Sequence, residues 1–307
     1  MSFRPENEAH GGASGRPPDE PPDSELSATR NIPAEERRRG RFAGRPGRRL
    51  ASLAAGLLLL VLLLIGAVLL WRSYGDRAGG TSVYENSVDS GPSPTVRITN
   101  GPGRVRVEGS KGSEKVEISA KRYARGLTPA GAKDNAANVP VDINQDGSTV
   151  EISTDGGRGT GADYDLKVPP GSAVEVESSM GDVEVSGLTS DAKVRAEEGD
   201  VTVKDVQGSV TIEAPQGDVS VGSVSTETGN AEITVGSGDV DLKDLVVGIL
   251  EARIEAGDVT LSGRFSGSGK VFVQTGSITS HLPSEDAKDL DLETRVGEVA
   301  RDEQKSE

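Results

Sequence analysis

The sequence predicts an all-β fold: a parallel β-solenoid that follows a disordered N-terminal tail and one transmembrane helix. Three observations predict this fold class. A Gly-Asp-Val unit recurs five times at nearly constant spacing in the second half of the chain. Apolar and polar residues alternate on both sides of every copy, which is the pattern of β-strands. One apolar run near the N-terminus is long enough to cross a bilayer.

The first segment, residues 1–49, has the composition of a disordered chain. It is rich in Pro, Gly and charged residues, and its apolar residues follow no period. It includes the stretches RPPDEPPD and RRRGRFAGRPGRR, of which the second is strongly basic. We therefore expect a solvated tail whose arginines lie against anionic headgroups. The proline-rich stretch could alternatively serve as a polyproline II ligand.

Residues 50–71 form an apolar run without a charged residue. A helix of this length, at about 1.5 Å per residue, spans a hydrocarbon core of roughly 30 Å. Seven arginines lie between residues 37 and 49, whereas only Arg72 and Arg77 follow closely. The positive-inside rule therefore predicts a single-pass protein of the plasma membrane, with a cytoplasmic N-terminus and an extracytoplasmic C-terminal part. The lipid bilayer is thus the first expected partner.

A cleaved signal peptide is the main alternative for residues 50–71. Its apolar region would be about 7–15 residues long and would end at an A-x-A-like site. The stretch WRSYGDRAGG, which follows the run, offers no such site. We therefore favour an uncleaved anchor over a signal peptide and over a buried soluble helix.

Residues 72–93 are rich in Gly, Ser and other polar residues, and they predict a flexible linker. The β-domain is expected over residues 94–300, followed by a polar C-terminal tail, 301–307. The strand pattern begins irregularly, because residues 122–147 form a longer excursion between two weak copies of the repeat. It becomes regular after about residue 172.

The five copies of the repeat open at glycines that lie 18 to 21 residues apart: Gly181, Gly199, Gly217, Gly238 and Gly257. Weaker copies follow at Gly276 and Gly297. Small apolar residues, mostly Val, Ile and Leu, recur two and four residues after each glycine and five and seven residues before it. The residues between them are mostly polar, so each repeat predicts two strands with one buried face.

Each Gly-Asp pair is expected to form a corner between two strands. Glycine permits a positive φ, and the aspartate is expected to bond its own local backbone. Antiparallel hairpins in a meander or sandwich could also use such corners. We favour a solenoid, because coils stacked in register at about 4.8 Å place equivalent residues in columns, and equivalent positions here share a residue type. From Gly297 onward we expect a polar end that stops further stacking.

Two stretches carry a resemblance to a known family: residues 100–122, NGPGRVRVEGSKGSEKVEISAKR, and the Gly-Asp-Val ladder of residues 178–262. The layout resembles the bacterial putative-adhesin proteins of the DUF4097 type, a β-strand-repeat family, over about residues 94–300. The resemblance implies a β-helix-like domain behind a single membrane anchor or signal. It also implies a protein without catalytic residues, and some members look linked to envelope-stress regulation.

The aspartates of the five copies form one column in the predicted solenoid: Asp182, Asp200, Asp218, Asp239 and Asp258. Carboxylates about 5 Å apart would repel one another by roughly 1 kcal/mol per pair in a water-like dielectric. A bound Ca²⁺ could relieve this repulsion, since carboxylates and turn carbonyls are suitable ligands. Calcium-binding nonapeptide repeats, however, have their glycines and aspartates in close tandem. We therefore expect corner residues and keep a calcium ladder as the alternative.

The composition excludes several classes of function. The chain has no Cys and only two His, so thiolate chemistry, catalysis by His and zinc sites are disfavoured. The net charge is -15, and an acidic domain repels nucleic-acid phosphates. Aromatic residues make up 3% of the chain, which disfavours stacking of sugars or bases. No catalytic, cofactor-binding or small-molecule substrate site is predicted.

The predicted function is therefore that of a non-catalytic, adhesin-like interaction protein. Its solenoid would project into the extracytoplasmic space and bind an envelope or surface partner through a solenoid face or an exposed strand edge. The first alternative is an envelope-stress sensor that signals through its anchor and its short cytoplasmic tail. An enzyme built on a β-helix is the second alternative, although no pair of carboxylates stands out.

Overall fold

The computed structural model describes residues 64–65, 78–157, 159–283, 285–286 and 288–301. The predicted tail, residues 1–49, lies outside the described residues, as does the predicted membrane helix, residues 50–71, apart from Leu64 and Ile65. Among the described residues, no helix combines the length and the apolar character needed to cross a membrane.

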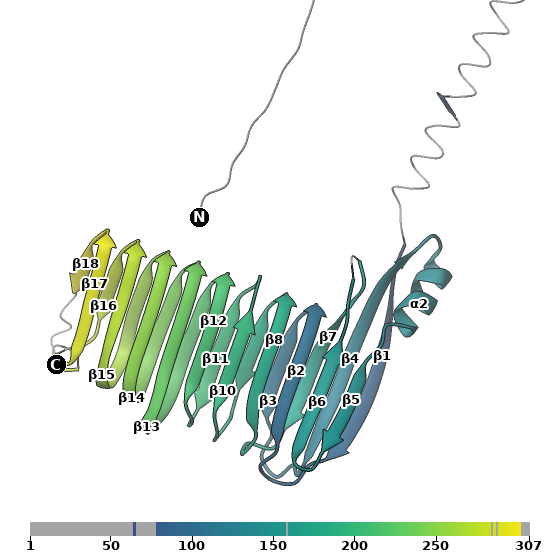
Figure 1. Ribbon diagram of the computed structural model, residues 1–307, viewed down its shortest axis with the longest axis horizontal. Helices are drawn as coiled ribbons and strands as arrows, with labels where there is room; N and C mark the ends of the chain where they lie inside the picture. Colours follow the sequence, from purple (N-terminus) through teal and green to yellow (C-terminus); the bar gives the residue numbers. More distant parts are fainter. Residues whose placement is uncertain (1–63, 66–77, 158, 284, 287, 302–307) are drawn as a thin grey trace, which may run out of the picture. The chain divides into compact units, whose positions relative to one another are not determined.

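The described part of the chain is an all-β protein with a parallel β-solenoid, as the sequence predicts. Its 18 strands form one continuous hydrogen-bonded sheet (Figure 1). Apart from the two helical residues Leu64 and Ile65, the helix in the described part is α2. The elements are β1 (Ala78–Asp89), β2 (Thr95–Pro102), β3 (Val105–Gly109), β4 (Lys115–Gly126), α2 (Pro129–Ala137), β5 (Asp142–Asp146), β6 (Thr149–Thr154), β7 (Gly161–Val168), β8 (Ala173–Met180), β9 (Val183–Ser186), β10 (Ala192–Ala196), β11 (Val201–Val206), β12 (Val210–Gln216), β13 (Val219–Ser237), β14 (Val240–Ala256), β15 (Val259–Thr275), β16 (Ile278–His281), β17 (Leu290–Val296) and β18 (Val299–Arg301).

The sheet winds into stacked coils with two opposed sides, which we name by their position relative to the corner glycines (Figure 1). The pre-Gly face consists, in spatial order, of β5, β6, β2, β8, β10, β12, the second halves of β13, β14 and β15, and β17. The post-Gly face consists of β1, β4, β7, β3, β9, β11, the first halves of β13, β14 and β15, β16 and β18. Most neighbouring coils pair in parallel and in register, with local register shifts within β13, β14 and β15.

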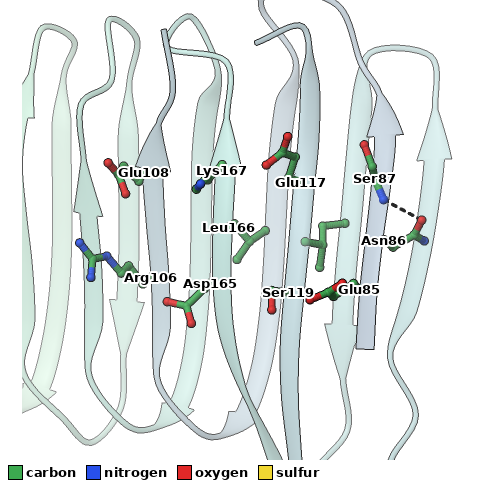
Figure 2. A pocket seen from close by; sticks show the side chains of 11 residues that line it. Glu85, Asn86, Ser87, Arg106, Glu108, Glu117, Ser119, Asp165, Leu166 and Lys167 are labelled. Carbon is green, nitrogen blue, oxygen red and sulfur yellow. Dashed lines mark hydrogen bonds between the residues drawn. The ribbon is translucent and has the colours of Figure 1, made fainter. Parts of the chain in front are cut away.

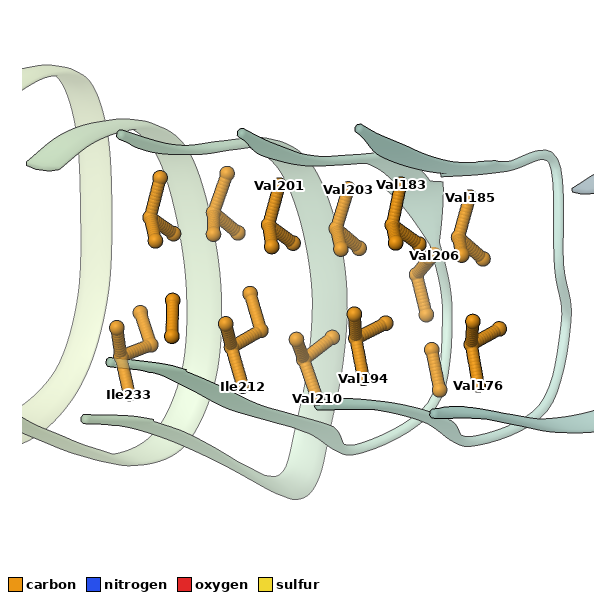
Figure 3. Packing of buried hydrophobic residues seen from close by; sticks show 14 of the residues in the cluster. Val176, Val183, Val185, Val194, Val201, Val203, Val206, Val210, Ile212 and Ile233 are labelled. Atoms are coloured by element: carbon orange, nitrogen blue, oxygen red, sulfur yellow. The ribbon is translucent and has the colours of Figure 1, made fainter. Parts of the chain in front are cut away.

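The core is a thin layer of stacked aliphatic side chains between the two faces (Figure 3). In one coil, Val194 from the pre-Gly face and Val201 and Val203 from the post-Gly face are completely or almost completely buried. Val201 pairs with Val183 in the preceding coil and with Val219 in the next, so identical side chains form a column. β-Branched residues suit such a pleated, buried surface. The predicted alternation on both sides of each glycine is confirmed.

The coils of the N-terminal part do not stack in chain order. The coil of β2 and β3 lies between the coil of β6 and β7 and the coil of β8 and β9, with parallel pairing on both sides. This order arises because β4 runs back antiparallel to β7, and α2 and β5 then lead the chain into β6. The periodicity near Gly103 and Gly157 indicates two coils correctly, but it carries no information about which coils are neighbours.

The N-terminal end of the solenoid is covered by reversed strands and a helix, although β1 and β5 each keep one edge that pairs with no described strand. β1 pairs antiparallel with β4, and β5 pairs antiparallel with β6. The Gln145 side chain spans this end and donates from Nε2 to the carbonyl oxygen of Asp89 at 2.8 Å. The prediction of a flexible linker over residues 72–93 is wrong for Ala78–Asp89, because Tyr84 and Val88 pack against the core from β1.

Helix α2 completes this covered end. Thr128 caps it by accepting a hydrogen bond from the Gly131 amide, and Pro129 opens it, where a missing N–H costs nothing. Ala132 is buried, and the helix backbone lies so close to β1 that a Cβ on Gly80 would overlap the Ala132 backbone. Small residues on both sides therefore allow the helix to seal the first coils.

The N-terminal coils also hold polar side chains inside the core. Asn100 is buried and donates from Nδ2 to the carbonyl oxygens of Gly103 and Ala162, at 2.9 and 3.1 Å. Tyr164 is buried, and its hydroxyl pairs with that of Thr154. Burial raises the pKa of Tyr164, because desolvation penalises the phenolate. These hydrogen bonds satisfy groups that would otherwise destabilise the core.

The C-terminal end of the solenoid is open. β17 pairs only with β15, and β18 pairs only with β16, within the described residues. Val299 continues the buried column of Ile278 and Val259, yet 38% of it is exposed, compared with 0% for Ile278. The predicted polar end from Gly297 stays a prediction, because residues 302–307 lie outside the described residues. The core pattern runs to the last described coil, and no described element covers it.

Candidate interaction surfaces

The corner glycines form a column in which only glycine fits. Gly199 has a φ of +132°, a region that side chains disfavour. A Cβ on Gly199 would also lie 2.5 Å from the carbonyl oxygen of Gly181 in the preceding coil. The Gly199 amide donates to the Gln216 carbonyl of the next coil at 3.0 Å, which ties neighbouring corners together. The predicted role of these glycines as corners follows from both the backbone geometry and the close stacking.

The aspartates beside these glycines are exposed, and each bonds to a neighbouring coil. The expectation that they bond their own local backbone is wrong, because the stacking of coils brings a different amide closer. The Oδ1 atoms of Asp182, Asp200, Asp218, Asp239 and Asp258 accept from the backbone amides of Asp200, Asp218, Asp239, Asp258 and Ser277, respectively, at 2.8–3.1 Å. The column is therefore a ladder of carboxylate–amide hydrogen bonds that fixes the spacing of the corners.

One oxygen of each ladder carboxylate is thus already engaged by the backbone. Within the part of the chain that the structure describes, no group of three or more His, Cys, Asp or Glu side chains gathers as a metal site requires. Calcium binding by the ladder stays a prediction. A higher melting temperature of the full chain in millimolar Ca²⁺ than in chelator, at low salt, would support it.

A second corner lies six residues after each corner glycine, and the sequence analysis missed it. Asp205, Ser223 and Asp244 adopt the left-handed conformation at this position, with φ of 53–54°, and Gly187 and Gly263 occupy it in other coils. The Asp244 carboxylate accepts from the Arg264 amide of the next coil at 3.1 Å. A mixture of Asp, Ser and Gly at one repeat position was the available signal, because these residues share a tolerance for turns.

The outer side of the pre-Gly face carries a row of ion pairs. Arg97 contacts Glu151 at 3.5 Å and Glu175 at 3.1 Å, and Lys193 contacts Glu175 at 2.8 Å. The hydrogen bond from Lys193 is the largest of the effects that hold the pKa of Glu175 below its ordinary value. The row Glu151–Arg97–Glu175–Lys193 follows the spatial order of the coils, so opposite charges alternate across four strands. Its charges largely neutralise one another.

The outer side of the post-Gly face has a different electrostatic character near its N-terminal end. There β1, β4, β7 and β3 form a polar groove with a volume of about 730 Å³, which Figure 2 shows from close by. Cross-strand pairing places Lys167 between Glu117 and Glu108, and Asp165 between Ser119 and Arg106. We call this surface the polar groove. Its remaining polar lining, Glu85, Asn86 and Ser87, comes from β1.

The side chains of the polar groove are mostly unengaged. Arg106 contacts Glu184 at 3.8 Å, but Glu85, Glu108, Glu117, Asp165 and Lys167 have no ion pair or side-chain hydrogen bond among the described residues. Four carboxylates face two cations, so the groove carries an excess of negative charge. Such a surface can bind a polar partner, because its charged groups are available and already exposed. Sequence alone did not indicate it, since it depends on the non-sequential order of β3, β7 and β4.

The fold and these surfaces define a class: a parallel β-solenoid with Gly-Asp corners, whose core is covered by α2 at one end and by no described element at the other. The family described as Toastrack DUF4097 matches residues 104–307, and the chain belongs to this family. The resemblance inferred from residues 100–122 and 178–262 is thereby confirmed.

Solved structures similar to this chain include three from bacteria. A putative adhesin from Bacteroides fragilis NCTC 9343 is 16% identical, with a TM-score of 0.48, and the match covers 72% of this chain and 97% of that chain. A putative adhesin from Parabacteroides distasonis ATCC 8503 is 17% identical, with a TM-score of 0.44 and coverage of 73% and 98%. A putative cell adhesion protein from Clostridium sporogenes ATCC 15579 is 12% identical, with a TM-score of 0.27 and coverage of 74% and 100%. No curated protein matches the chain significantly.

Proposed function

We propose that this chain is a membrane-anchored, extracytoplasmic interaction protein of the adhesin type that acts by binding rather than by catalysis. The observation that carries the proposal is the polar groove, in which the exposed charged side chains of a four-strand surface, apart from Arg106, lack ion-pair partners within the described residues. A sheet of stacked coils holds such side chains at fixed spacing, so little conformational freedom is lost from the backbone on binding. The partner would be a component of the cell envelope or of a facing surface.

The excess of carboxylates suggests what the groove favours. Glu85, Glu108, Glu117 and Asp165 line it, against Arg106 and Lys167. A partner that presents amino or guanidinium groups would form charge-assisted hydrogen bonds with the carboxylates. By contrast, the ion-paired row on the pre-Gly face would have to break its own contacts before binding anything. The charged side chains of the pre-Gly row are engaged with one another, whereas those of the polar groove are mostly available. The polar groove is therefore the proposed binding surface.

Substitution of one groove carboxylate tests this proposal. The full chain would be expressed in its own cell envelope and cross-linked to its neighbours, and the cross-linked fraction would be compared with that of Glu117→Lys. The matched control is Glu232→Lys, which reverses an exposed glutamate of the pre-Gly face that forms no ion pair with the described residues. We expect Glu117→Lys to lose most of the cross-linked partner and Glu232→Lys to retain it. Equal retention by both variants would rule out the groove.

Membrane anchorage is supported by the apolar run of residues 50–71 and the arginines before it. Protease added outside intact cells should digest the β-domain and spare residues 1–49, and the reverse result would contradict the proposed topology. The envelope-stress alternative is separable by the tail. Replacing residues 1–49 with an unrelated basic segment would abolish the output of a sensor, whereas an interaction protein would still bind its partner.

A further inference from the structure

The last coil of the solenoid presents a strand edge and the end of the core together. Leu292 is only partly buried and Val299 is 38% exposed, although both stand at positions that are buried in earlier coils, such as Val271 and Ile278. Val296 is 60% exposed beside them. Apolar side chains in this arrangement would continue a core if another strand paired with β17.

The free hydrogen-bonding groups of β17 can be assigned from its pairing with β15. Gly269 donates to the carbonyl oxygen of Asp289, so the backbone groups of odd-numbered residues in this region face β15. Because these groups alternate along a strand, those of Leu292 and Thr294 point to the open edge. An incoming strand would therefore hydrogen-bond at Leu292 and Thr294 and would lie beside Glu293 without bonding it.

We infer that the open edge of β17 binds a second copy of this chain, by antiparallel pairing of the two β17 strands about a two-fold axis at Glu293. In this register Asp291 of each copy lies opposite Arg295 of the other, and Leu292 lies opposite Thr294. Arg295 is exposed and has no ion pair within the described residues, so the pairing gives it a carboxylate partner. Opposite charges directly across an antiparallel pair stabilise it.

The single like-charge contact of this register is compensated. The two Glu293 side chains would meet at the axis, but Lys270 of each copy already lies 2.9 Å from its own Glu293. This contact raises the pKa of Lys270, chiefly through the hydrogen bond to Glu293. A register centred one residue earlier, at Leu292, would instead place Asp291 against Glu293 on both sides of the axis. Charge complementarity excludes that register. A register centred at Thr294 would place Glu293 opposite Arg295 on both sides of the axis, and the charge exchange at residues 291 and 295 distinguishes it from the register centred on Glu293.

The opposite end presents its edges differently. Within the described residues β1 pairs only with β4 and β5 only with β6, so each keeps an unpaired edge. β1 and β5 end the two faces with antiparallel strands, α2 packs against β1 and β4, and Gln145 bonds across the gap to Asp89. Pairing through β17 alone gives a closed pair, whereas pairing through β1 or β5 as well would give a filament, and sedimentation of the full chain separates the two. The inference concerns only the edge of β17, so it stands apart from the polar groove and from the membrane anchor.

Because the chain has no Cys, a single introduced thiol is a clean reporter. The full chain carrying Glu293→Cys, in detergent micelles, would be oxidised mildly and analysed by non-reducing electrophoresis. At the axis the two Cα atoms would be about 4.5 Å apart, within the range of a disulfide. The matched control, Thr234→Cys, places a thiol at the equivalent exposed position in the middle of the pre-Gly face.

We expect a disulfide-linked dimer from Glu293→Cys and only monomer from Thr234→Cys. Equal yields from both would indicate random collision, and monomer from both would show that the two strands do not pair about Glu293; either result overturns the inference. If the wild-type chain formed a dimer only after removal of residues 302–307, the inference would also be overturned. That result would mean that the chain's own C-terminal tail occupies the edge of β17.

A charge exchange tests the register independently of the thiol. Arg295→Asp alone places two acidic residues opposite each other on both sides of the axis, and it should weaken dimerisation roughly tenfold, as measured by sedimentation of the full chain. Adding Asp291→Arg restores opposite charges across the axis and should restore the dimer. A double variant as weak as the single variant would contradict the register centred on Glu293.

Discussion

The two ends of the solenoid differ in how they treat the same repeating core. At the N-terminal end the last strands reverse direction, α2 seals the first coils and Gln145 bonds across to Asp89. At the C-terminal end the column of Ile278 continues to Val299 and then has no described cover. The coils between the ends share one geometry. The repeated coils supply the buried core that stabilises the fold, whereas the structure at each end determines whether a further strand can pair with the sheet.

The largest loss of stability is expected from a substitution that disrupts the coils between the two ends. Gly199→Val places a side chain at a φ of +132° and against the Gly181 carbonyl, so we expect a loss of more than about 3 kcal/mol in the free energy of unfolding. Thermal unfolding followed by circular dichroism measures it. Asp200→Asn is the control, because its amide oxygen can still accept from Asp218. Comparable losses from both variants would refute the corner account.

The next effect separates the two ends directly. Arg122 donates from Nη1 to the carbonyl oxygens of Ala137 and Val139 and from Nη2 to Ser82, which joins β4 to β1 and to the end of α2. Arg122→Ala should therefore lower the free energy of unfolding by about 2 kcal/mol. The matched change at the open end, Arg295→Ala, should leave unfolding of the monomer unchanged in urea titrations. If both variants were equally destabilised, the covered and open ends would not differ as described.

A smaller effect concerns the second corner of the coils. Ser223 has a φ of 54°, where a side chain costs about 1 kcal/mol and glycine costs less. Ser223→Gly should therefore raise the free energy of unfolding by about 0.5 kcal/mol, after the greater entropy of glycine in the unfolded chain is subtracted. Ser220→Gly, within the regular part of β13, should lower it instead. Destabilisation by both changes would show that the corner is not strained.

The smallest effect lies in the ion-paired row of the N-terminal part. The pKa of Glu175 is below its ordinary value, chiefly because Lys193 bonds the carboxylate. The resulting stabilisation is present at neutral pH and is lost as the pH falls through the lowered pKa. Glu175→Gln should reduce the melting temperature at pH 7 by roughly 1–2 °C and not at all well below pH 4. Glu232→Gln, which removes a glutamate without an ion pair among the described residues, should have no effect at either pH.

The regular coils could be predicted from sequence more completely than the contacts between coils or the order in which they stack. In the regular coils the inward positions around Gly199 and Gly217 were predictable, because period two and register are local properties of each repeat. The partner of the Asp200 carboxylate was not, since the accepting contact depends on the amide of Asp218 in the next coil. Nor was the position of β2 and β3, because stacking order is set by the antiparallel return of β4.

The two candidate surfaces also differ in how far sequence could predict them. The strand edge at β17 and β18 has a sequence signal, since Val299 repeats the column of Ile278. The polar groove has none, because Lys167 and Glu117 are fifty residues apart in the chain and become neighbours only through antiparallel pairing. Surfaces built from one repeat can thus be inferred from sequence, whereas surfaces built across reordered strands require the structure.

Hydrogen exchange of the full chain, measured by mass spectrometry at increasing protein concentration, tests the difference between the ends most directly. The account predicts that amides of β17, including Leu292 and Thr294, become more protected as the concentration rises, while those of β1 do not change. Protection of β17 that is independent of concentration, or an equal rise at β1 and β17, would contradict it.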